Sequence, residues 1–337
     1  MTIRKKALAM TAVAVAAALA LTACSSGGGA QQTQTRATGS AEAGGGGAVA
    51  DTPRLTIAMV THETPGDTFW DKIRKGAEAA AAKDNVDLKY SNDPSAPAQA
   101  TLIQNAVDSK VDGIASTLVT PDALAPAVKS ATTAGIPVVG FNSGIDQWKE
   151  LGALMYFGSD ETLAGQTVGQ RIADEGGKHP LCVIQAAGSV ALEARCAGVK
   201  AKAPGTENLQ VDGTNDGAVV STIQAKLQQD PSIDYVVTLG APIALDTLQS
   251  VSSANSTAKI VTFDLNADVA KNIKDGKILF SIDQQPYVQG YMAVTSLYLN
   301  IKNGNDIGGG KPVLTGPSFV DKDNIGAILP FAKNNTR

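Results

Sequence analysis

The sequence contains few aromatic residues, histidines and cysteines, and each scarcity excludes a kind of site. Only 4% of the 337 residues are aromatic, and there are two histidines and three cysteines. So few potential ligands do not make a zinc set, and we expect no metal site and no cofactor. The chain also lacks a Gly-x-Ser-x-Gly segment, a His-Glu-x-x-His segment and a phosphate-binding loop. Without these signatures of nucleophilic, metal-assisted or phosphoryl chemistry, we expect that the protein is not an enzyme.

A surplus of basic residues is also missing. The chain has 28 Lys and Arg against 32 Asp and Glu, giving a net charge of -4. Proteins that bind nucleic acid neutralise phosphates with basic side chains, so we expect no nucleic-acid partner. No helix-turn-helix pattern precedes Leu55, which argues against a transcription regulator.

The N-terminus has the pattern of an exported, lipid-modified protein. Three basic residues precede an apolar run at 7–21, which matches a signal-peptide core and is short for a membrane span. Leu-Thr-Ala then leads into Cys24, which resembles the bacterial lipobox; an ordinary signal peptide with an incidental cysteine is the alternative. We expect a signal peptide at 1–23 and a lipidated Cys24. Residues 24–52, rich in Gly, Ser, Ala, Gln and Thr, would be a flexible tether to the outer face of the cell membrane.

The cysteine count fits export. Lipidation of Cys24 leaves Cys182 and Cys196 as a pair. An exported protein meets an oxidising environment, in which such a pair can bond. We favour a Cys182–Cys196 disulfide, with two buried thiols as the alternative.

Beyond the tether, short apolar runs alternate with segments of helical periodicity. This alternation predicts right-handed crossovers and parallel sheets. Because the pattern restarts near residue 159, we expect an α/β protein of two doubly wound parallel-sheet lobes. The predicted strands are 55–60, 87–90, 113–118, 137–141, 181–185, 208–211, 235–239, 259–263 and 278–282, and the predicted helices are 69–83, 98–109, 124–134, 159–173, 192–202, 218–228, 243–252, 269–275 and 287–300.

Polar and aromatic side chains follow predicted strands in both halves. Ligands of open parallel sheets bind beyond the carboxyl ends of the strands. Carboxylates, amides and arginine pair with hydroxyl groups, while aromatic faces cover C–H surfaces. The set as a whole favours a small polyhydroxylated ligand, although any single Asp or Asn is better explained as a turn former or helix cap. The candidate ligand-binding residues are His62, Asp67, Phe69, Trp70, Thr120, Asn142, Glu193, Arg195, Asn215, Asp264 and Gln284.

Several short segments carry a resemblance to a known family. They are Pro-Gly-Asp-Thr-Phe-Trp at 65–70, Val-Asp-Gly-Ile at 111–114, Ala-Gly-Ile-Pro-Val-Val at 134–139, Gly-Ser-Asp at 158–160 with Ala-Gly at 164–165, and Phe-Asp at 263–264. With them, the chain from about residue 55 to 328 resembles the periplasmic sugar-binding proteins of the ribose/galactose-binding type.

The resemblance implies a type I periplasmic-binding-protein-like fold whose lobes are joined by a three-crossing hinge. It also implies that a ligand between the lobes stabilises a closed form, which the membrane subunits of an ABC importer recognise. A lipoprotein that signals to a membrane receptor is the alternative, and we expect a monomer. The implied ranges are 53–158 plus 285–314 for the N-terminal lobe, 159–284 plus 315–337 for the C-terminal lobe, and 157–159, 283–286 and 313–317 for the crossings.

The resemblance also assigns roles to single residues. The family's polar residue and aromatic pair after the first strand resemble Asp67, Phe69 and Trp70, and its later contacts resemble Asn142, Arg195, Asp264 and Gln284. Two departures from the family pattern stand out: Ser143 replaces an arginine, and Gly-Ala-Pro at 240–242 replaces Asn-Asp. With fewer polar groups there, the sequence favours a short polyol or pentose over an extended pyranose, and an inositol is an alternative.

Overall fold

The computed structural model describes residues 49–337. The predicted signal peptide, the lipidated Cys24 and all but the last four residues of the predicted tether lie outside the described residues. Among the residues described, no helix is both long and apolar enough to span a membrane.

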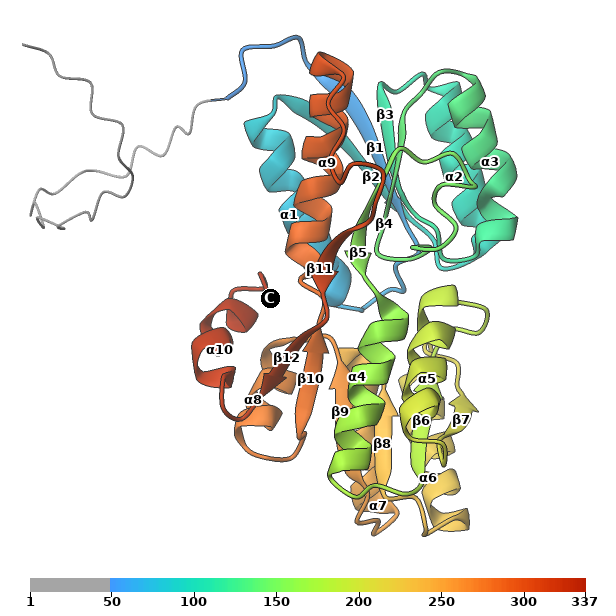
Figure 1. Ribbon diagram of the computed structural model, residues 1–337, viewed down its shortest axis with the longest axis vertical. Helices are drawn as coiled ribbons and strands as arrows, with labels where there is room; N and C mark the ends of the chain where they lie inside the picture. Colours follow the sequence, from blue (N-terminus) through green and yellow to red (C-terminus); the bar gives the residue numbers. More distant parts are fainter. Residues whose placement is uncertain (1–48) are drawn as a thin grey trace, which may run out of the picture. The chain divides into compact units, whose positions relative to one another are not determined.

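The first of two six-stranded sheets is entirely parallel and has the strand order β11-β5-β4-β3-β1-β2 (Figure 1). Helices α1 and α9 cover one face and α2 and α3 cover the other. The bounds are β1 Leu55–Thr61, β2 Val86–Asn92, β3 Gly113–Thr117, β4 Val138–Phe141, β5 Met155–Ser159, β11 Val313–Gly316, α1 Phe69–Lys83, α2 Ala96–Asp108, α3 Pro121–Thr133 and α9 Pro286–Asn303.

The second sheet repeats this plan with the order β12-β10-β9-β8-β6-β7. Helices α4 and α5 pack on one face, whereas α6, α7, α8 and α10 belong to two further apolar clusters. The bounds are β6 Pro180–Ile184, β7 Glu207–Gln210, β8 Tyr235–Thr238, β9 Lys259–Phe263, β10 Phe280–Asp283, β12 Ser318–Asp321, α4 Glu161–Asp174, α5 Val190–Lys202, α6 Asp216–Gln229, α7 Ala241–Ser253, α8 Ala267–Lys274 and α10 Ile325–Lys333.

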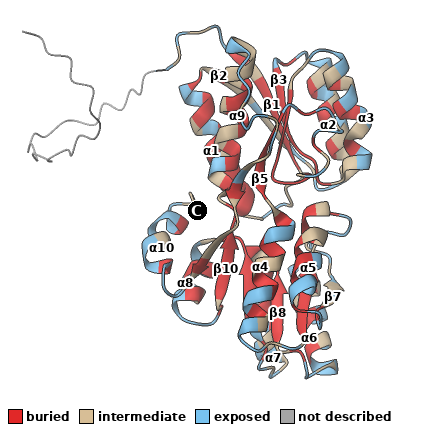
Figure 2. Ribbon diagram, viewed as in Figure 1, coloured by how far each residue is buried: buried red, intermediate tan, exposed pale blue. Residues whose placement is uncertain are grey.

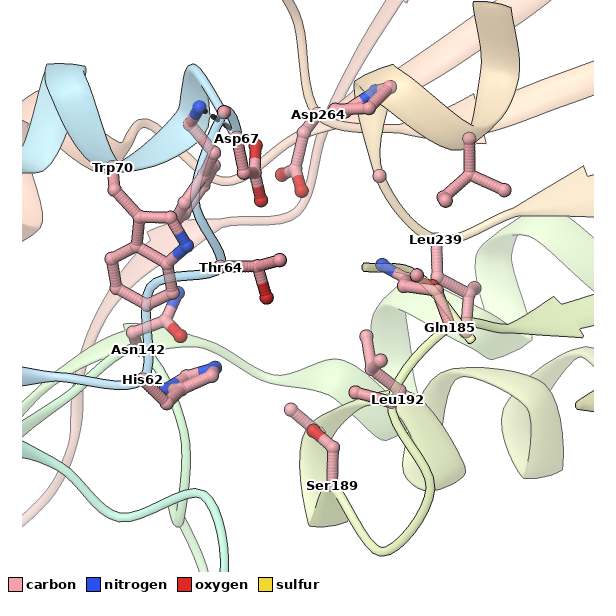
Figure 3. A pocket seen from close by; sticks show the side chains of 18 of the residues that line it. His62, Thr64, Asp67, Trp70, Asn142, Gln185, Ser189, Leu192, Leu239 and Asp264 are labelled. Atoms are coloured by element: carbon pink, nitrogen blue, oxygen red, sulfur yellow. Dashed lines mark hydrogen bonds between the residues drawn. The ribbon is translucent and has the colours of Figure 1, made fainter. Parts of the chain in front are cut away.

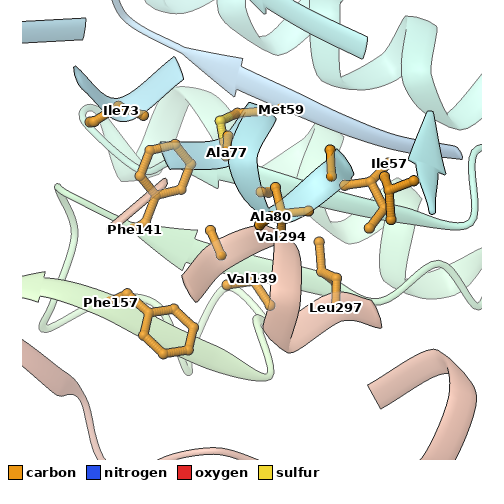
Figure 4. Close-up of a cluster of buried hydrophobic side chains, with 14 of the residues drawn as sticks. Ile57, Met59, Ile73, Ala77, Ala80, Val139, Phe141, Phe157, Val294 and Leu297 are labelled. Carbon is orange, nitrogen blue, oxygen red and sulfur yellow. The ribbon is translucent and has the colours of Figure 1, made fainter. Parts of the chain in front are cut away.

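Strand β1 shows why both faces of a sheet must be covered. Ile57 and Met59 point into the apolar cluster shared with α1 and α9, which Figure 4 shows. Ala58 and Val60 point into the cluster shared with α2 and α3. Because alternate side chains face opposite sides of a strand, a continuous apolar run is stable only with helices on both faces. Figure 2 shows the resulting pattern of buried strands and half-exposed helices.

The predicted fold class is confirmed, and every predicted strand and helix overlaps an observed one. Four short elements were not predicted: β5, β11, β12 and α10. Strands this short are not identified by periodicity alone, and β11, β12 and α10 lie beyond the last predicted helix, outside the strand–helix alternation that identified the other short strands. In addition, β12 pairs antiparallel with β10, so the second sheet has one antiparallel edge strand.

The chain passes between the two sheets three times within residues 49–337. The passages lie between β5 and α4, between β10 and α9, and between β11 and β12. Each of them falls at or next to one of the crossings expected from the sequence.

Close packing of α4 on α5 fixes the position of Arg195. A Cβ atom on Gly165 would lie 2.1 Å from the carbonyl oxygen of Arg195, and one on Gly198 would lie 2.5 Å from that of Thr162. Glycine at these two positions lets the helix backbones touch. Next to Arg195, Cys196 forms a disulfide with Cys182 of β6, with 5.8 Å between the Cα atoms, which confirms the favoured pairing.

Candidate functional site

A cavity of about 170 Å³ lies where the carboxyl ends of strands from both sheets meet. Both sheets place their second strand outside their first and their third on the other side, so a topological switch point falls between β1 and β3 and another between β6 and β8. The cavity is smaller than the roughly 300–1,000 Å³ of sites for drug-sized ligands, so it suits a small solute. Figure 3 shows side chains of the first lobe, such as Trp70, facing Leu239 and Leu192 of the second.

Most of the predicted ligand-binding residues line this cavity. Three do not. Asn215 caps α6, its side chain accepting a hydrogen bond of 3.0 Å from the amide of Ala218. Thr120 immediately precedes α3, and Glu193 lies in the first turn of α5. The predicted residues that line the cavity are His62, Asp67, Phe69, Trp70, Asn142, Arg195, Asp264 and Gln284.

Arg195 is a buried cation held rigidly at the cavity wall. Its Nε and Nη2 donate to the two carboxylate oxygens of Glu161 at 2.6 and 3.1 Å, and its Nη1 donates to the carbonyl oxygen of Leu239 at 3.0 Å. Both side chains of this ion pair are only 3% exposed. Burial alone would lower the pKa of Arg195, but the charges of Glu161 and Asp264 outweigh it and raise the pKa. The guanidinium is therefore charged and held in one orientation by contacts within the protein.

Asp264 is a buried carboxyl group with an unusual backbone conformation. Its φ of 66° lies in the left-handed region, which Asp tolerates better than most residues. Oδ1 accepts a hydrogen bond of 2.8 Å from Nε2 of Gln284. Burial raises the pKa of Asp264 to about 7, against the opposing effects of Arg195 and Gln284. The group therefore titrates near neutral pH.

Asp67 faces Asp264 from the first lobe (Figure 3). Its Oδ1 accepts a hydrogen bond of 3.0 Å from the amide of Phe69, and burial raises its pKa. Lys72, in the first turn of α1, is fully buried and donates to the carbonyl oxygen of Thr68 at 3.0 Å. Burial lowers the pKa of Lys72, while the charges of Asp264 and Asp67 raise it. A buried lysine thus balances part of the acidic charge beside the cavity.

His62 presents a neutral imidazole. Burial and the charge of Arg195 lower its pKa to about 3. Its Nδ1 lies 2.8 Å from the hydroxyl of Thr117, and that hydroxyl accepts a hydrogen bond of 2.9 Å from Gln99. Because the Thr117 proton is then free to be donated to Nδ1, these bonds favour the tautomer with the proton on Nε2. The ring also packs edge-on against Trp70, with 4.7 Å between the centroids.

A network of amides joins the cavity to the hinge. Nδ2 of Asn142 donates to Oε1 of Gln284 at 3.2 Å and to Oε1 of Gln289 at 3.3 Å. Nε2 of Gln289 donates in turn to Gln284 Oε1 at 3.0 Å and to the hydroxyl of Thr315 at 3.1 Å. The network therefore connects the end of β4, the β10–α9 passage and β11. A movement of the Gln284 side chain would alter hydrogen bonds at these passages between the lobes.

The candidate set from the sequence did not include four polar residues of the cavity wall: Thr64, Gln185, Ser189 and Asp216. Gln185 was assigned to the end of a strand, but it is the first residue after β6. Its position directly after a buried strand at the switch point was the signal that was available.

Comparisons with known proteins agree with this geometry. Residues 57–306 match the periplasmic binding protein domain family. The xylose/arabinose-binding protein XylF of Sulfolobus acidocaldarius is 26% identical over 83% of this chain and 74% of its own, and a xylitol-binding protein of Mycolicibacterium smegmatis is 27% identical over 84% and 81%. A carbohydrate transporter from Acidothermus cellulolyticus 11B, solved in complex with myo-inositol, is 61% identical, with a TM-score of 0.84 over 85% of this chain and 100% of that one.

Two α/β lobes, three passages and a polar cavity at the facing strand ends define a two-lobed solute-binding protein. The chain belongs to the periplasmic binding protein family, because the match covers well over half of its length. The sequence resemblance is thereby confirmed at the level of the family.

Proposed function

We propose that the protein captures a cyclic polyol of the inositol class in the cavity between its lobes and delivers it to an ABC importer. The carrying observation is the 61% identity, over 85% of this chain, to a carbohydrate transporter solved with myo-inositol. The sequence favoured a short polyol or pentose, with an inositol as an alternative. Because of this similarity, we propose the inositol as the ligand.

The chemistry of the cavity supports a neutral, hydroxyl-rich ring. Asp67 and Asp264 approach from opposite lobes as hydrogen-bond acceptors, and Arg195 lies beside Asp264 as a donor. Hydroxyl groups both donate and accept, so such a set can pair with a ring at several positions. Trp70 and Leu239 offer apolar surface for the C–H groups. An anionic ligand would instead meet two carboxyl groups.

Binding would couple to closure of the lobes. In this proposal, residues 53–158 plus 285–314 and residues 159–284 plus 315–337 move as two bodies about the three passages. A ligand that contacts both lobes favours the closed form by its additional contacts there. The membrane subunits of the importer would recognise that form. No bond-making step is proposed, and the working unit is a monomer, which light scattering of the ligand-bound protein would test.

The test is a thermal-shift screen of the purified protein, followed by calorimetry. The panel holds myo-inositol, xylitol, xylose, ribose and a set of amino acids. A specific ligand at about 100 times its dissociation constant should stabilise the fold by about 2.7 kcal/mol. Stabilisation by myo-inositol above all other solutes supports the proposal, whereas stabilisation by a pentose or an amino acid alone contradicts it.

We also propose that the protein is held at the outer face of the cell membrane by acylation of Cys24. The proposal rests on the basic, apolar and Leu-Thr-Ala-Cys sequence pattern. Mass spectrometry of the mature N-terminus should find an acylated cysteine, and Cys24→Ser should move the protein from the membrane fraction to the soluble one. An unmodified N-terminus, or a membrane fraction that Cys24→Ser leaves unchanged, would contradict the anchor.

A further inference from the structure

Gln185 occupies the switch point of the second sheet, beside Gly240. Strands β6 and β8 are neighbours, with Val183 paired to Thr238. Two residues further along each strand, the same register brings Gln185 next to Gly240. Both residues line the cavity. The carbonyl oxygen of Leu239, directly before Gly240, is the one that accepts from Arg195 Nη1. The side chain of Gln185 therefore stands near the fixed cation of the site.

Two glycines leave space for this side chain. A Cβ atom on Gly240 would lie 3.0 Å from Nε2 of Gln185, and a Cβ atom on Gly213 would lie 2.8 Å from Cβ of Gln185. The amide of Gly213 also donates to the carbonyl oxygen of Gln185 at 3.0 Å, which fixes its backbone. The backbone of Gly240 is extended, a conformation open to any residue. The backbone conformation of Gly240 therefore does not require glycine. Glycine at this position is explained by the space that the carboxamide of Gln185 occupies.

The carboxamide of Gln185 has an unused acceptor. Its Oε1 is buried and has no hydrogen-bond partner within residues 49–337. A buried acceptor that stays unpaired costs about 1–3 kcal/mol, so a partner is expected from outside the chain. Gln185 is one of the residues that line the cavity, and rotation about its terminal torsion would turn Oε1 toward it, so we expect the partner to come from the cavity.

We propose that Gln185 is a specificity-determining ligand contact whose Oε1 accepts a hydrogen bond from one ring hydroxyl of the bound cyclic polyol. The inference rests on the proposed function and deepens it, because it assigns the recognition of one ligand hydroxyl to a single side chain. A site built around such an acceptor discriminates against the analogue that lacks the hydroxyl, since Oε1 is then buried without a partner. Gly240 contributes by leaving the carboxamide its place.

The test is calorimetry on the purified full-length protein with myo-inositol and its monodeoxy analogues as probes. The Gln185→Met variant keeps the length of the side chain and removes the carboxamide. It should bind myo-inositol about tenfold more weakly than the wild type, and the ligand-free variant should melt at a higher temperature than the wild type, because the unpaired buried acceptor is removed. It should also lose the wild-type preference for myo-inositol over one deoxy analogue while keeping its preferences over the others. A merely structural role would weaken all ligands alike.

A double-mutant cycle tests whether the absence of a side chain at Gly240 is needed for the position of the Gln185 carboxamide. Gly240→Ala should weaken myo-inositol binding in the wild type but not in a Gln185→Ala background, because the side chain that the new methyl displaces is then absent. Gly217→Ala is the control, because its Cβ would meet nothing closer than 3.6 Å.

The outcomes separate the two proposals. If the wild type binds no inositol, the proposed function fails and the role of Gln185 fails with it. If the wild type binds myo-inositol and Gln185→Met keeps both the affinity and the full pattern of preferences, only the role of Gln185 is overturned. An ordered water that satisfies Oε1 in the bound state would give this second result.

Discussion

Arg195 and Asp264 approach each other at the cavity without forming a hydrogen bond. Nη1 of Arg195 lies 3.9 Å from Oδ2 of Asp264, while Nε and Nη2 of the same guanidinium are bonded to Glu161. Gln284 supplies a hydrogen bond to Oδ1 of Asp264. The carboxyl group of Asp264 is thus buried beside a cation whose hydrogen bonds go to Glu161 and Leu239. The Asp264 oxygens can still accept hydrogen bonds from hydroxyl groups of a ligand.

We predict that ligand affinity rises with pH between about pH 5 and pH 8. The pKa of Asp264 is about 7 in the ligand-free protein, set by burial against the charge of Arg195, and ligand hydroxyls that donate to the carboxylate favour its charged form. The bound state then holds fewer protons than the free state, so binding releases protons and weakens as the pH falls below 7. Calorimetry in buffers of different ionisation enthalpy measures this release. An affinity that is flat across the range would contradict the role of Asp264.

Substitution of the same residue should separate stability from binding. The pKa of Asp264 is raised on folding, so its favourable contribution to stability is complete below its unfolded pKa near 4 and is lost as the pH rises through about 7. At pH 8, Asp264→Asn should therefore raise the melting temperature of the ligand-free protein, with little change at pH 4. Ligand affinity should fall at least tenfold, because an anionic acceptor is lost. The exposed Asp306→Asn serves as the control, for which we expect neither effect.

Glu161→Gln should destabilise the fold by about 3 kcal/mol. The substitution removes the hydrogen-bonded counter-charge of the buried Arg195, and removing one partner of a buried pair costs about 3–5 kcal/mol. Because Gln keeps one acceptor for the guanidinium, we expect the lower end of that range. Denaturant midpoints measure the loss. The matched control is Asp275→Asn, which breaks the exposed pair of Lys271 and Asp275 and should leave the midpoint unchanged. Equal effects of the two substitutions would contradict the special position of the buried pair.

Removal of the disulfide should lower stability while leaving the site largely intact. Cys182 and Cys196 are 14 residues apart, and closing a loop of this length stabilises a fold by about 3 kcal/mol in the chain-entropy account. Cys182→Ala combined with Cys196→Ala should lower the denaturant midpoint accordingly. Ligand affinity should change by less than about threefold, because Arg195 is also held by Glu161 and Leu239. Loss of binding at unchanged stability would show that the disulfide holds the site and not the fold.

The fold was predictable because its signals are local. A buried strand such as β1 is a run of apolar residues, and α1 shows Ile73, Ala77 and Ala80 at helical spacing, so each appears within one window of the chain. Alternation of such windows is enough to predict two parallel α/β lobes. Two of the missed strands, β11 and β12, are four residues long, and each joins its sheet through a strand that is distant in sequence: β11 pairs with β5, and β12 pairs with β10.

The site was predictable in its outline and not in its detail. Strand ends of a parallel sheet meet at one edge, so polar residues such as Asp67 and Asp264 were expected to converge. Asn215 shows the limit, since an asparagine after a strand has the same sequence signature whether it caps a helix or faces a ligand. Gln185 shows the opposite limit: its place after a buried strand at the switch point was a signal, but nothing local distinguished it from an ordinary strand-end residue that does not line a cavity.

The sequence by itself determined most of the elements and their order, the family and the cysteines available for a disulfide. The tertiary structure alone decided that Lys72 is fully buried beside acidic groups, that Asp264 titrates near pH 7, and that Gly240 leaves room for Gln185. The reason is physical: secondary structure depends on neighbours a few residues apart, whereas burial, charge and hydrogen-bond partners depend on groups that are distant in sequence and meet only when the sheets have formed.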